Sequence, residues 1–459
     1  MRLDEEGRII VAEAQVATGS AGSDSPPLAG VRVLALEQYQ SLPFATNILA
    51  RLGAEVIKVE LPPAGEMSRV STPGLTDAAG RYHSGTFLRN NHNKRSLAVD
   101  WRTPEGGALV RRAAARCDVF AENFRPGALG KYGLSYEQLA EAAPRLIYAS
   151  ISGFGQDPET PYFSRPAFAT VVEAMSGFYS AASASDDPPV VGSAGALGDT
   201  VSGLYAAIGI MAALRSRDVT GVGQHLDIAM LDCMLGIQDF GLSQWCLRNE
   251  GTTSVGIVHA FRAADGWFVL NVNRHHQFAK LADVIGRPEW ASDASLSSAQ
   301  DWVDRMEDVV RPGIEAWSAG RTRSQLCAVL TEAGLAAGPV LTFGEVSGDP
   351  HLAQRHMLVD SGLKTADGSP YLFPGDPIRL RQQPRRPDAF PPPLGRDGPG
   401  LLAELGLSAA EIEALREAGV ISVTSLRQPG ISRWPGSRRR PYGTGRRPPG
   451  RRAGAGRSR

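Results

Sequence analysis

Cysteine and long apolar runs are scarce in this sequence of 459 residues. Its four cysteines are scattered and form no CxxC pair, which argues against a zinc cluster or disulfide framework and indicates free thiols. No apolar run reaches the roughly 18 residues that a membrane span requires. The first 27 residues contain no apolar signal segment, so residues 1–27 are expected to form a flexible polar extension. We therefore expect a cytoplasmic protein with no metal site and no membrane contact.

Acidic residues are missing from the end of the chain. None follows Glu417, whereas eleven arginines do, although the whole chain has a formal net charge of zero. Residues 426–459 are mainly Arg, Pro, Gly and Ser, a composition that buries too little apolar surface to fold, so we expect a disordered tail. It is either a polyanion-binding segment or an extension without a selected role. Because Arg-rich tails bind polyanions non-specifically, no specific nucleic-acid partner is expected.

Strands and helices alternate in the first half of the chain, which predicts an α/β domain with a mainly parallel sheet. Short apolar runs indicate buried strands at 31–36, 56–59, 96–99, 118–121 and 146–151. Helices are expected at 43–52, after the N-cap pair Thr103-Pro104, and after a capping box that begins at Ser135. Further elements follow in a second region: a strand at 266–272, helices at 276–285, 302–317 and 323–333, an extended segment at 374–393 and a last helix at 401–418.

Two phosphate-binding fingerprints are missing. Residues 37–43, EQYQSLP, follow the first strand without a GxGxxG, and no GxxxxGK[ST] sequence occurs, which argues against an NAD site and a P-loop. His275 and His276 are adjacent and cannot face the same side of a helix, so they do not predict a metal site. No GxSxG is present to indicate a serine hydrolase.

One carboxylate stands at the expected start of a helix. Asp199 follows Gly198, and apolar residues such as Leu204 and Ile208 recur beyond it at helical spacing. A carboxylate in this position either caps the helix or is held exposed as a nucleophile that attacks an activated acyl group. The segment alone leaves both interpretations open.

Three further candidates follow expected strands. Gln40 comes after the first strand, and Asn123 and Phe124 come after the strand at 118–121. Ligands of parallel α/β sheets bind at the carboxyl ends of strands, where Asn123 offers donors and an acceptor and Phe124 a flat face for an adenine-like ring. Each residue also has an ordinary loop or turn interpretation.

Four segments, in chain order, resemble one family: GVRVLALEQYQSLPFATNILARLGAEVIKVELP, NNHNKRSLAVDWRTPEGGALVRRAAARCDVFAENFRPGALGKYGL, PRLIYASISGFGQ and GALGDTVSGLYAAIGIMAALRSRDVTGVGQHLDIAMLDCML. They are similar to class III CoA-transferases, the family of carnitine CoA-transferase and formyl-CoA:oxalate CoA-transferase, and the resemblance extends from about Leu28 to Ile421. It implies a Rossmann-like large domain with a smaller α+β domain, in an interlocked homodimer with coenzyme A between the two domains. The implied boundaries are 28–225 for the first part of the large domain, 226–335 for the small domain and 336–425 for the return to the large domain.

The resemblance also implies a reaction, the transfer of coenzyme A from an acyl-CoA donor to a carboxylic acid acceptor. Asp199 matches the family's nucleophile, which forms a mixed anhydride and then an aspartyl-CoA thioester, and Gln40 matches a glutamine near that thioester. Coenzyme A and acyl-CoA are substrates, and no tightly bound cofactor, metal or ATP is implied. The residues that match the CoA-binding site are Val99, Asn123, Phe124 and Lys131.

The chain departs from the family where many members carry an aromatic residue followed by an acid. Phe168 and Ala169 stand there, so a hydroxyl and a carboxylate are lost. Leu61 stands where some members have a basic residue. The glycine-rich lid of the formyl-CoA enzyme is not visible at 251–258, and its absence from the sequence weakens the case for oxalate as acceptor. The α-methylacyl-CoA racemases of the family need a histidine where Phe168 stands. A racemase and a non-catalytic CoA-binding protein are the alternatives, and Asp199 favours the transferase.

Overall fold

The structure is a computed structural model of the chain. It describes residues 2–3, 9–10, 25–77, 79–181, 190–192, 195–238, 240–247, 256–365, 367–383 and 387–422. The predicted tail, 426–459, lies outside the described residues, as do most of the extension at 1–27 and of the segment at 251–258. Within the extension, β1 (Arg2–Leu3) pairs with β2 (Ile9–Ile10).

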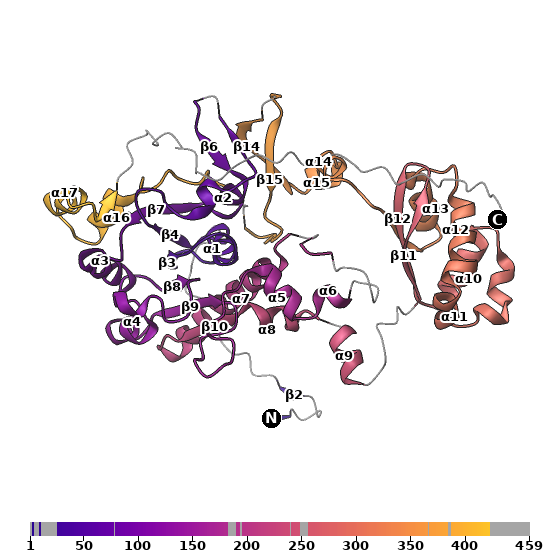
Figure 1. The fold of residues 1–459 in the computed structure, drawn as a ribbon, viewed down its shortest axis with the longest axis horizontal. Helices are drawn as coiled ribbons and strands as arrows, with labels where there is room; N and C mark the ends of the chain where they lie inside the picture. The colour runs from indigo at the N-terminus through magenta and orange to yellow at the C-terminus, as the bar shows by residue number, and fades with distance from the viewer. Residues whose placement is uncertain are drawn as a thin grey trace, which may run out of the picture.

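A seven-stranded sheet forms the centre of the large domain (Figure 1). Its order is β10-β9-β8-β3-β4-β7-β16, and every neighbouring pair is parallel except β16 with β7. The strands are β3 (Arg32–Leu36), β4 (Glu55–Glu60), β7 (Lys94–Val99), β8 (Val119–Glu122), β9 (Ile147–Ser152), β10 (His225–Ala229) and β16 (Ile421–Ser422). The prediction of an α/β fold with a mainly parallel sheet is confirmed.

The strand order reverses at β3. From β3 the chain builds outward through β4 and β7, and it then crosses to the other side of β3 to form β8, β9 and β10. At such a reversal the loops that leave the two neighbouring strands diverge and open a crevice at the carboxyl edge of the sheet. The segments after β3 and β8 are therefore the first place to look for a ligand site.

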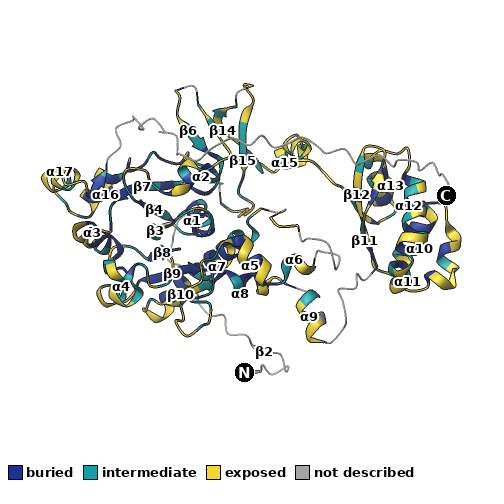
Figure 2. Ribbon diagram, in the orientation of Figure 1, coloured by how far each residue is buried: buried dark blue, intermediate teal, exposed yellow. Residues whose placement is uncertain are grey.

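Helices cover both faces of this sheet (Figure 2). Alternate strand residues belong to two separate cores, one on each face. One face, which includes Val33 and Ala35, packs against α1 (Ser41–Arg51), α5 (Ala169–Met175), α7 (Leu197–Thr220) and α8 (Met230–Gly236). The opposite face, which includes Leu34 and Leu36, packs against α3 (Pro104–Ala114), α4 (Tyr136–Ala142) and α16 (Gly398–Glu404). Among the described helices, α7 alone has the length and apolar composition of a membrane span, and half of its most apolar window is buried in the protein.

A third core lies in a smaller unit, away from the large sheet (Figure 1). Three antiparallel strands, β11 (Ile257–Ala263), β12 (Gly266–Val272) and β13 (Ala336–Pro339), pack against helices. The helices are α10 (His275–Val284), α11 (Ala299–Asp304), α12 (Arg311–Ser318) and α13 (Arg323–Glu332). The ring of Phe278 stacks on that of Trp302 with the centroids 4.3 Å apart. The chain reaches this unit after α9 (Phe240–Cys246) and leaves it through α14 (Phe343–Ser347) and α15 (Pro350–Gln354).

The structure places several elements differently from the sequence prediction. β10 belongs to the large sheet and ends at Ala229, and β13 belongs to the small sheet and ends at Pro339. The helix predicted at 401–418 is wrong, because α16 and α17 (Ala409–Glu417) are separated at Gly406, whose φ of +84° lies in the left-handed region. The helix predicted at 302–317 is divided into α11, a π-turn and α12.

Short elements were missed where the apolar pattern is weak. Among them are the hairpins β5 (Gly74–Thr76) with β6 (Tyr82–Ser84) and β14 (Leu358–Lys364) with β15 (Pro370–Pro374), and the helices α2 (Gly85–Asn90) and α6 (Phe178–Ala181).

Candidate active site

Asp199 lies in the first turn of α7, where it is the third residue of the helix. The N-cap residue is Ala196, whose side chain makes no capping hydrogen bond, so Asp199 is not the N-cap that one interpretation of the sequence allowed. The side chain is partly buried, and this burial together with the charge of Glu173 raises the pKa of Asp199 to about 6. Its carboxylate is therefore poorly stabilised as an anion, which suits a nucleophile.

The carboxylate that binds the start of α7 comes from another helix. Glu173 on α5 is only 1% exposed, and its Oε1 accepts a hydrogen bond from the backbone N–H of Gly198 at 2.9 Å. Its other oxygen accepts a hydrogen bond from the hydroxyl of Tyr179. Glu173 was not predicted as a site residue from the sequence. Its spacing from Ala169, where many family members carry an acid, could have indicated it. Glu173 follows Ala169 by four residues and therefore lies on the same side of α5, one turn later.

The N-terminal ends of α1 and α7 lie against each other, and this contact brings two predicted site residues together. Gln40 directly precedes α1, and its carbonyl accepts a hydrogen bond from the N–H of Phe44 at 2.9 Å. Gly203 follows Asp199 by one turn of α7. A Cβ added at Gly203 would lie 2.6 Å from the carbonyl oxygen of Ser41 and 2.9 Å from the ring of Phe44. Gln40 and Asp199 therefore occupy the starts of two helices in close contact.

This close approach makes a prediction about stability. In Gly203→Ala the added methyl group meets the backbone oxygen of Ser41, which cannot move without displacing α1. We expect the free energy of unfolding, measured in urea, to fall by about 1–3 kcal/mol. Gly338→Ala is a matched control, because nothing lies within 4 Å of the Cβ that it adds. Equal stability of the two variants would show that α1 and α7 do not depend on this glycine.

Asn123 joins the two loops at the reversal of strand order. Its Oδ1 accepts a hydrogen bond from the N–H of Gln38 at 2.8 Å, and its Nδ2 donates to the carbonyl of Gln38 at 2.9 Å. The same Nδ2 donates to the hydroxyl of Ser41 at 3.2 Å. The amide thus fixes the segment that leads to Gln40, and its predicted contact with coenzyme A comes in addition to this role.

The other predicted CoA-binding residues lie near this edge of the sheet or beside it. Phe124 is partly buried and meets Trp101 edge to face, with the ring centroids 5.8 Å apart. Val99 is fully buried at the end of β7, where it pairs with Ile421 of β16. Lys131 is exposed in a short 3₁₀ turn, with its Nζ 4.9 Å from the centre of the Tyr132 ring.

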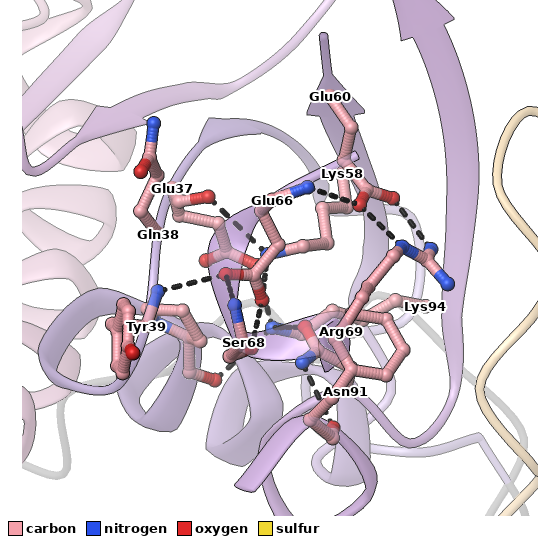
Figure 3. A network of polar contacts seen from close by, with 12 residues as sticks. Glu37, Gln38, Tyr39, Lys58, Glu60, Glu66, Ser68, Arg69, Asn91 and Lys94 are labelled. Atoms are coloured by element: carbon pink, nitrogen blue, oxygen red, sulfur yellow. Dashed lines mark hydrogen bonds and ion pairs between the residues drawn. The ribbon is translucent and has the colours of Figure 1, made fainter. Parts of the chain in front are cut away.

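A buried charge network lies beneath the loop that carries Gln40 (Figure 3). Glu37, which directly follows β3, is 1% exposed, and its Oε1 accepts hydrogen bonds from the Nζ of Lys94 at 2.6 Å and of Lys58 at 3.2 Å. Burial alone would raise the pKa of Glu37, but the two ammonium groups hold it below its usual value. Burial lowers the pKa of Lys94 to about 8.

A second acid of the network holds the backbone of this loop. Glu66 is 4% exposed and lies 3.4 Å from the Nζ of Lys58. Its Oε2 accepts a hydrogen bond from the N–H of Tyr39 at 2.9 Å (Figure 3). Tyr39 has a φ of +60°, a conformation that costs free energy for any residue other than glycine and persists only when its surroundings impose it. The network therefore sets the path of the chain into Gln40.

Within the described ranges, no group of three or more His, Cys, Asp or Glu side chains is arranged to hold a metal ion. The polar features of the site are instead the ends of two helices, the partly buried carboxylate of Asp199 and the loops after β3 and β8. Fold and site together define an α/β protein with a polar site at the carboxyl edge of a parallel sheet.

Comparison with known proteins identifies the family. The family described as CoA-transferase family III matches residues 28–398, and the chain belongs to this family. It is 33% identical over 399 residues to the acetyl-CoA:oxalate CoA-transferase of Acetobacter aceti, covering 85% of this chain and 97% of that one. It is 34% identical to the succinate–glutarate CoA-transferase of Agrobacterium fabrum, over 83% of this chain and 96% of the relative.

A solved structure is similar as well. A CAIB/BAIF family protein from Brucella suis superimposes with a TM-score of 0.73 at 33% sequence identity, over 83% of this chain and all of that chain. The resemblance stated from the sequence is confirmed, and the chain is an enzyme of the class III CoA-transferase family. Enzymes of this kind use CoA thioesters as substrates.

Proposed function

We propose that this enzyme moves coenzyme A from an acyl-CoA donor to a carboxylic acid acceptor, with Asp199 as its covalent nucleophile. The observation that carries the proposal is the partly buried carboxylate in the first turn of α7, next to the helix that Gln40 begins. A carboxylate whose pKa is raised to about 6 is still mostly ionised at neutral pH, yet it gains stability when it forms an uncharged acyl derivative.

The proposed reaction exchanges acyl groups in balanced steps. The Asp199 carboxylate attacks the carbonyl carbon of the donor thioester, the C–S bond breaks, and CoA thiolate leaves behind a mixed anhydride. The thiolate then attacks the aspartyl carbonyl, which releases the donor acid and gives an aspartyl-CoA thioester. The acceptor carboxylate attacks the carbonyl of this thioester, the C–S bond breaks, and CoA thiolate leaves behind a second mixed anhydride. The thiolate then attacks the acceptor carbonyl of this anhydride, which gives the new acyl-CoA and releases the free Asp199 carboxylate.

Other residues bind and orient the substrate in this proposal. Gln40 donates its amide N–H to the carbonyl oxygen of the thioester, where negative charge develops. Phe124 lines the coenzyme A site, Val99 is the apolar residue on its adenine side, and Lys131 approaches its phosphates as a point charge. Coenzyme A lies between a Rossmann-like large domain and the small domain.

We also propose an interlocked homodimer. Its support is the exposed apolar face of α7, which carries Leu204, Tyr205 and Ile208. Sedimentation of the purified protein tests it, and a monomer at micromolar concentration would exclude it.

The racemase alternative lacks its acid/base group. The position that matches the racemase histidine is Phe168, at the start of α5, and its side chain is a 75% exposed hydrocarbon that cannot carry a proton. A non-catalytic coenzyme A-binding protein has no need of the Asp199 carboxylate in the first turn of α7, and the presence of this residue favours the transferase.

Mass spectrometry of the peptide that contains Asp199 tests the proposal. The protein is incubated with acetyl-CoA, succinyl-CoA and other acyl-CoA donors, and the adduct is trapped with hydroxylamine or borohydride. We expect a mass change at Asp199 with at least one donor and none in Asp199→Asn. Coenzyme A binding without modification by any donor would support the non-catalytic alternative.

A further inference from the structure

We infer that Glu173 is a positioning residue for the reaction, which keeps the Asp199 carboxylate reactive by occupying the start of α7 and placing a second negative charge beside it. This inference rests on the proposed function, because it assumes that Asp199 is the nucleophile. It assigns a role to a residue that the sequence analysis did not identify.

The first part of this role is a hydrogen bond taken away from Asp199. The free N–H groups in the first turn of a helix are the donors that stabilise a carboxylate placed there. Glu173 takes the one on Gly198, immediately before Asp199, at 2.9 Å. A carboxylate left with fewer donors is less stable as an anion and is a stronger nucleophile.

The helices are packed too tightly at this point for the arrangement to relax. A Cβ added at Gly198 would lie 2.9 Å from a methyl group of Val172 and 3.2 Å from the Cα of Ala169. Ala169 is 5% exposed and occupies the position where many family members have their acid. In this chain the acid stands one turn later, at Glu173, and reaches the backbone of α7 from there.

The second part of the role is the charge of Glu173, which no basic group in the described part of the chain neutralises. The elements packed against α5 are α6, α7 and α8. Their ionisable groups near Glu173 are Tyr179 on α6, which donates a hydrogen bond, and Asp199 on α7. On α8, Asp232 is exposed and Cys233 is a buried thiol whose pKa burial raises to about 11. None of these groups is a cation at neutral pH.

Two neighbouring carboxylates favour the covalent intermediates. When Asp199 becomes an anhydride or a thioester it loses its charge, so its repulsion by Glu173 disappears. The same repulsion opposes the return of Asp199 to a free carboxylate. Glu173 therefore favours attack on the donor and stabilises the aspartyl-CoA thioester against reversal.

Glu173→Gln tests the inference because it keeps an oxygen that accepts from Gly198 and removes the charge. The readout is the rate at which the Asp199 adduct forms in a single turnover with acetyl-CoA or succinyl-CoA, quenched and measured by mass spectrometry between pH 4.5 and 8. In the wild type we expect the rate to fall below about pH 6, as Asp199 becomes protonated. In the variant we expect this decline of the rate to begin about one pH unit lower. We expect the maximal rate, reached near neutral pH, to be about tenfold lower than in the wild type. Glu141→Gln, an exposed acid on α4, is the matched control and keeps the wild-type profile.

The outcomes separate this inference from the proposed function. An adduct at Asp199 whose pH profile is the same in wild type and Glu173→Gln would show that Glu173 only caps the helix. If the wild type forms no adduct with any donor, the proposed function itself fails. If Glu173→Gln does not fold, Tyr179→Phe replaces it, because this variant removes a hydrogen bond but leaves the charge. In Tyr179→Phe, the pH below which the rate of adduct formation declines is expected to be the same as in the wild type or higher. A decline that begins at a lower pH than in the wild type would overturn the inference.

Discussion

Replacing Asp199 by asparagine is expected to lower kcat for coenzyme A transfer by a factor on the order of 10⁴ or more. The amide is nearly the same size as the carboxylate but is too weak a nucleophile to open a thioester, so no anhydride can form. Steady-state assays with acetyl-CoA or succinyl-CoA as donor and several carboxylic acids as acceptors measure this loss.

Stability measurements show whether the loss of kcat in Asp199→Asn comes from the missing nucleophile or from unfolding of the variant. The pKa of Asp199 is raised by its surroundings, so the ionised side chain destabilises the folded protein once the pH exceeds its ordinary pKa, and fully so above about pH 6. Asp199→Asn removes this charge and is expected to unfold at the same or a higher urea concentration at pH 7. Asp232→Asn, an exposed acid on α8, is the control for the substitution itself. A residual activity above about 1% of the wild type would count against a covalent role.

The second large effect concerns the charge network beneath the Gln40 loop. Glu37→Gln leaves Lys58 and Lys94 buried with too little negative charge, and removing one partner of a buried ion pair costs about 3–5 kcal/mol. We expect a loss of this size in the free energy of unfolding of the large domain, measured by urea titration at pH 7. Glu413→Gln is the contrasting control, because it removes the acid of an exposed pair with Arg416 and should change stability little.

The pH dependence of this difference has a definite sign. The pKa of Glu37 is lowered in the folded protein, so its stabilising contribution is present above its unfolded value and disappears as the pH falls through the folded value. The difference in free energy of unfolding between the wild type and Glu37→Gln should therefore become smaller at acidic pH. A gap that is small at pH 7 and unchanged in acid would mean that the network contributes little to stability.

The elements that the sequence predicted well are those with strong local signals. The strands of the large sheet are apolar runs between turn residues, and the capping box of α4 at Ser135 and the Thr103 cap of α3 were found because the capping residues lie next to the helix they begin. The helix at 401–418 was wrong for a related reason, because the leucine pattern continues across Gly406 while the backbone turns.

The site was only partly predictable, because its contacts join distant parts of the chain. Asp199 and Gln40 could be named from their local setting and from the family resemblance. The bond of Glu173 to Gly198 spans 25 residues, and the bond of Lys94 to Glu37 spans 57. No local rule of spacing identifies such partners, and a buried acid or lysine looks like a surface residue in the sequence.

The order in which the large sheet is assembled has a consequence for synthesis on the ribosome. The outer neighbour of β7 in the sheet is β16, which lies near the end of the described chain. The backbone N–H of Ser96 in β7 donates a hydrogen bond to the side chain of Asp397, which is 301 residues later in the sequence. At 5–20 residues per second, translation of that interval takes roughly 15–60 s. During this time the outer edge of β7 and the apolar surface that α16 later buries are exposed, because β16 and α16 have not yet been synthesised. A nascent chain in this state is a substrate for chaperones and a target for aggregation long before the enzyme can act.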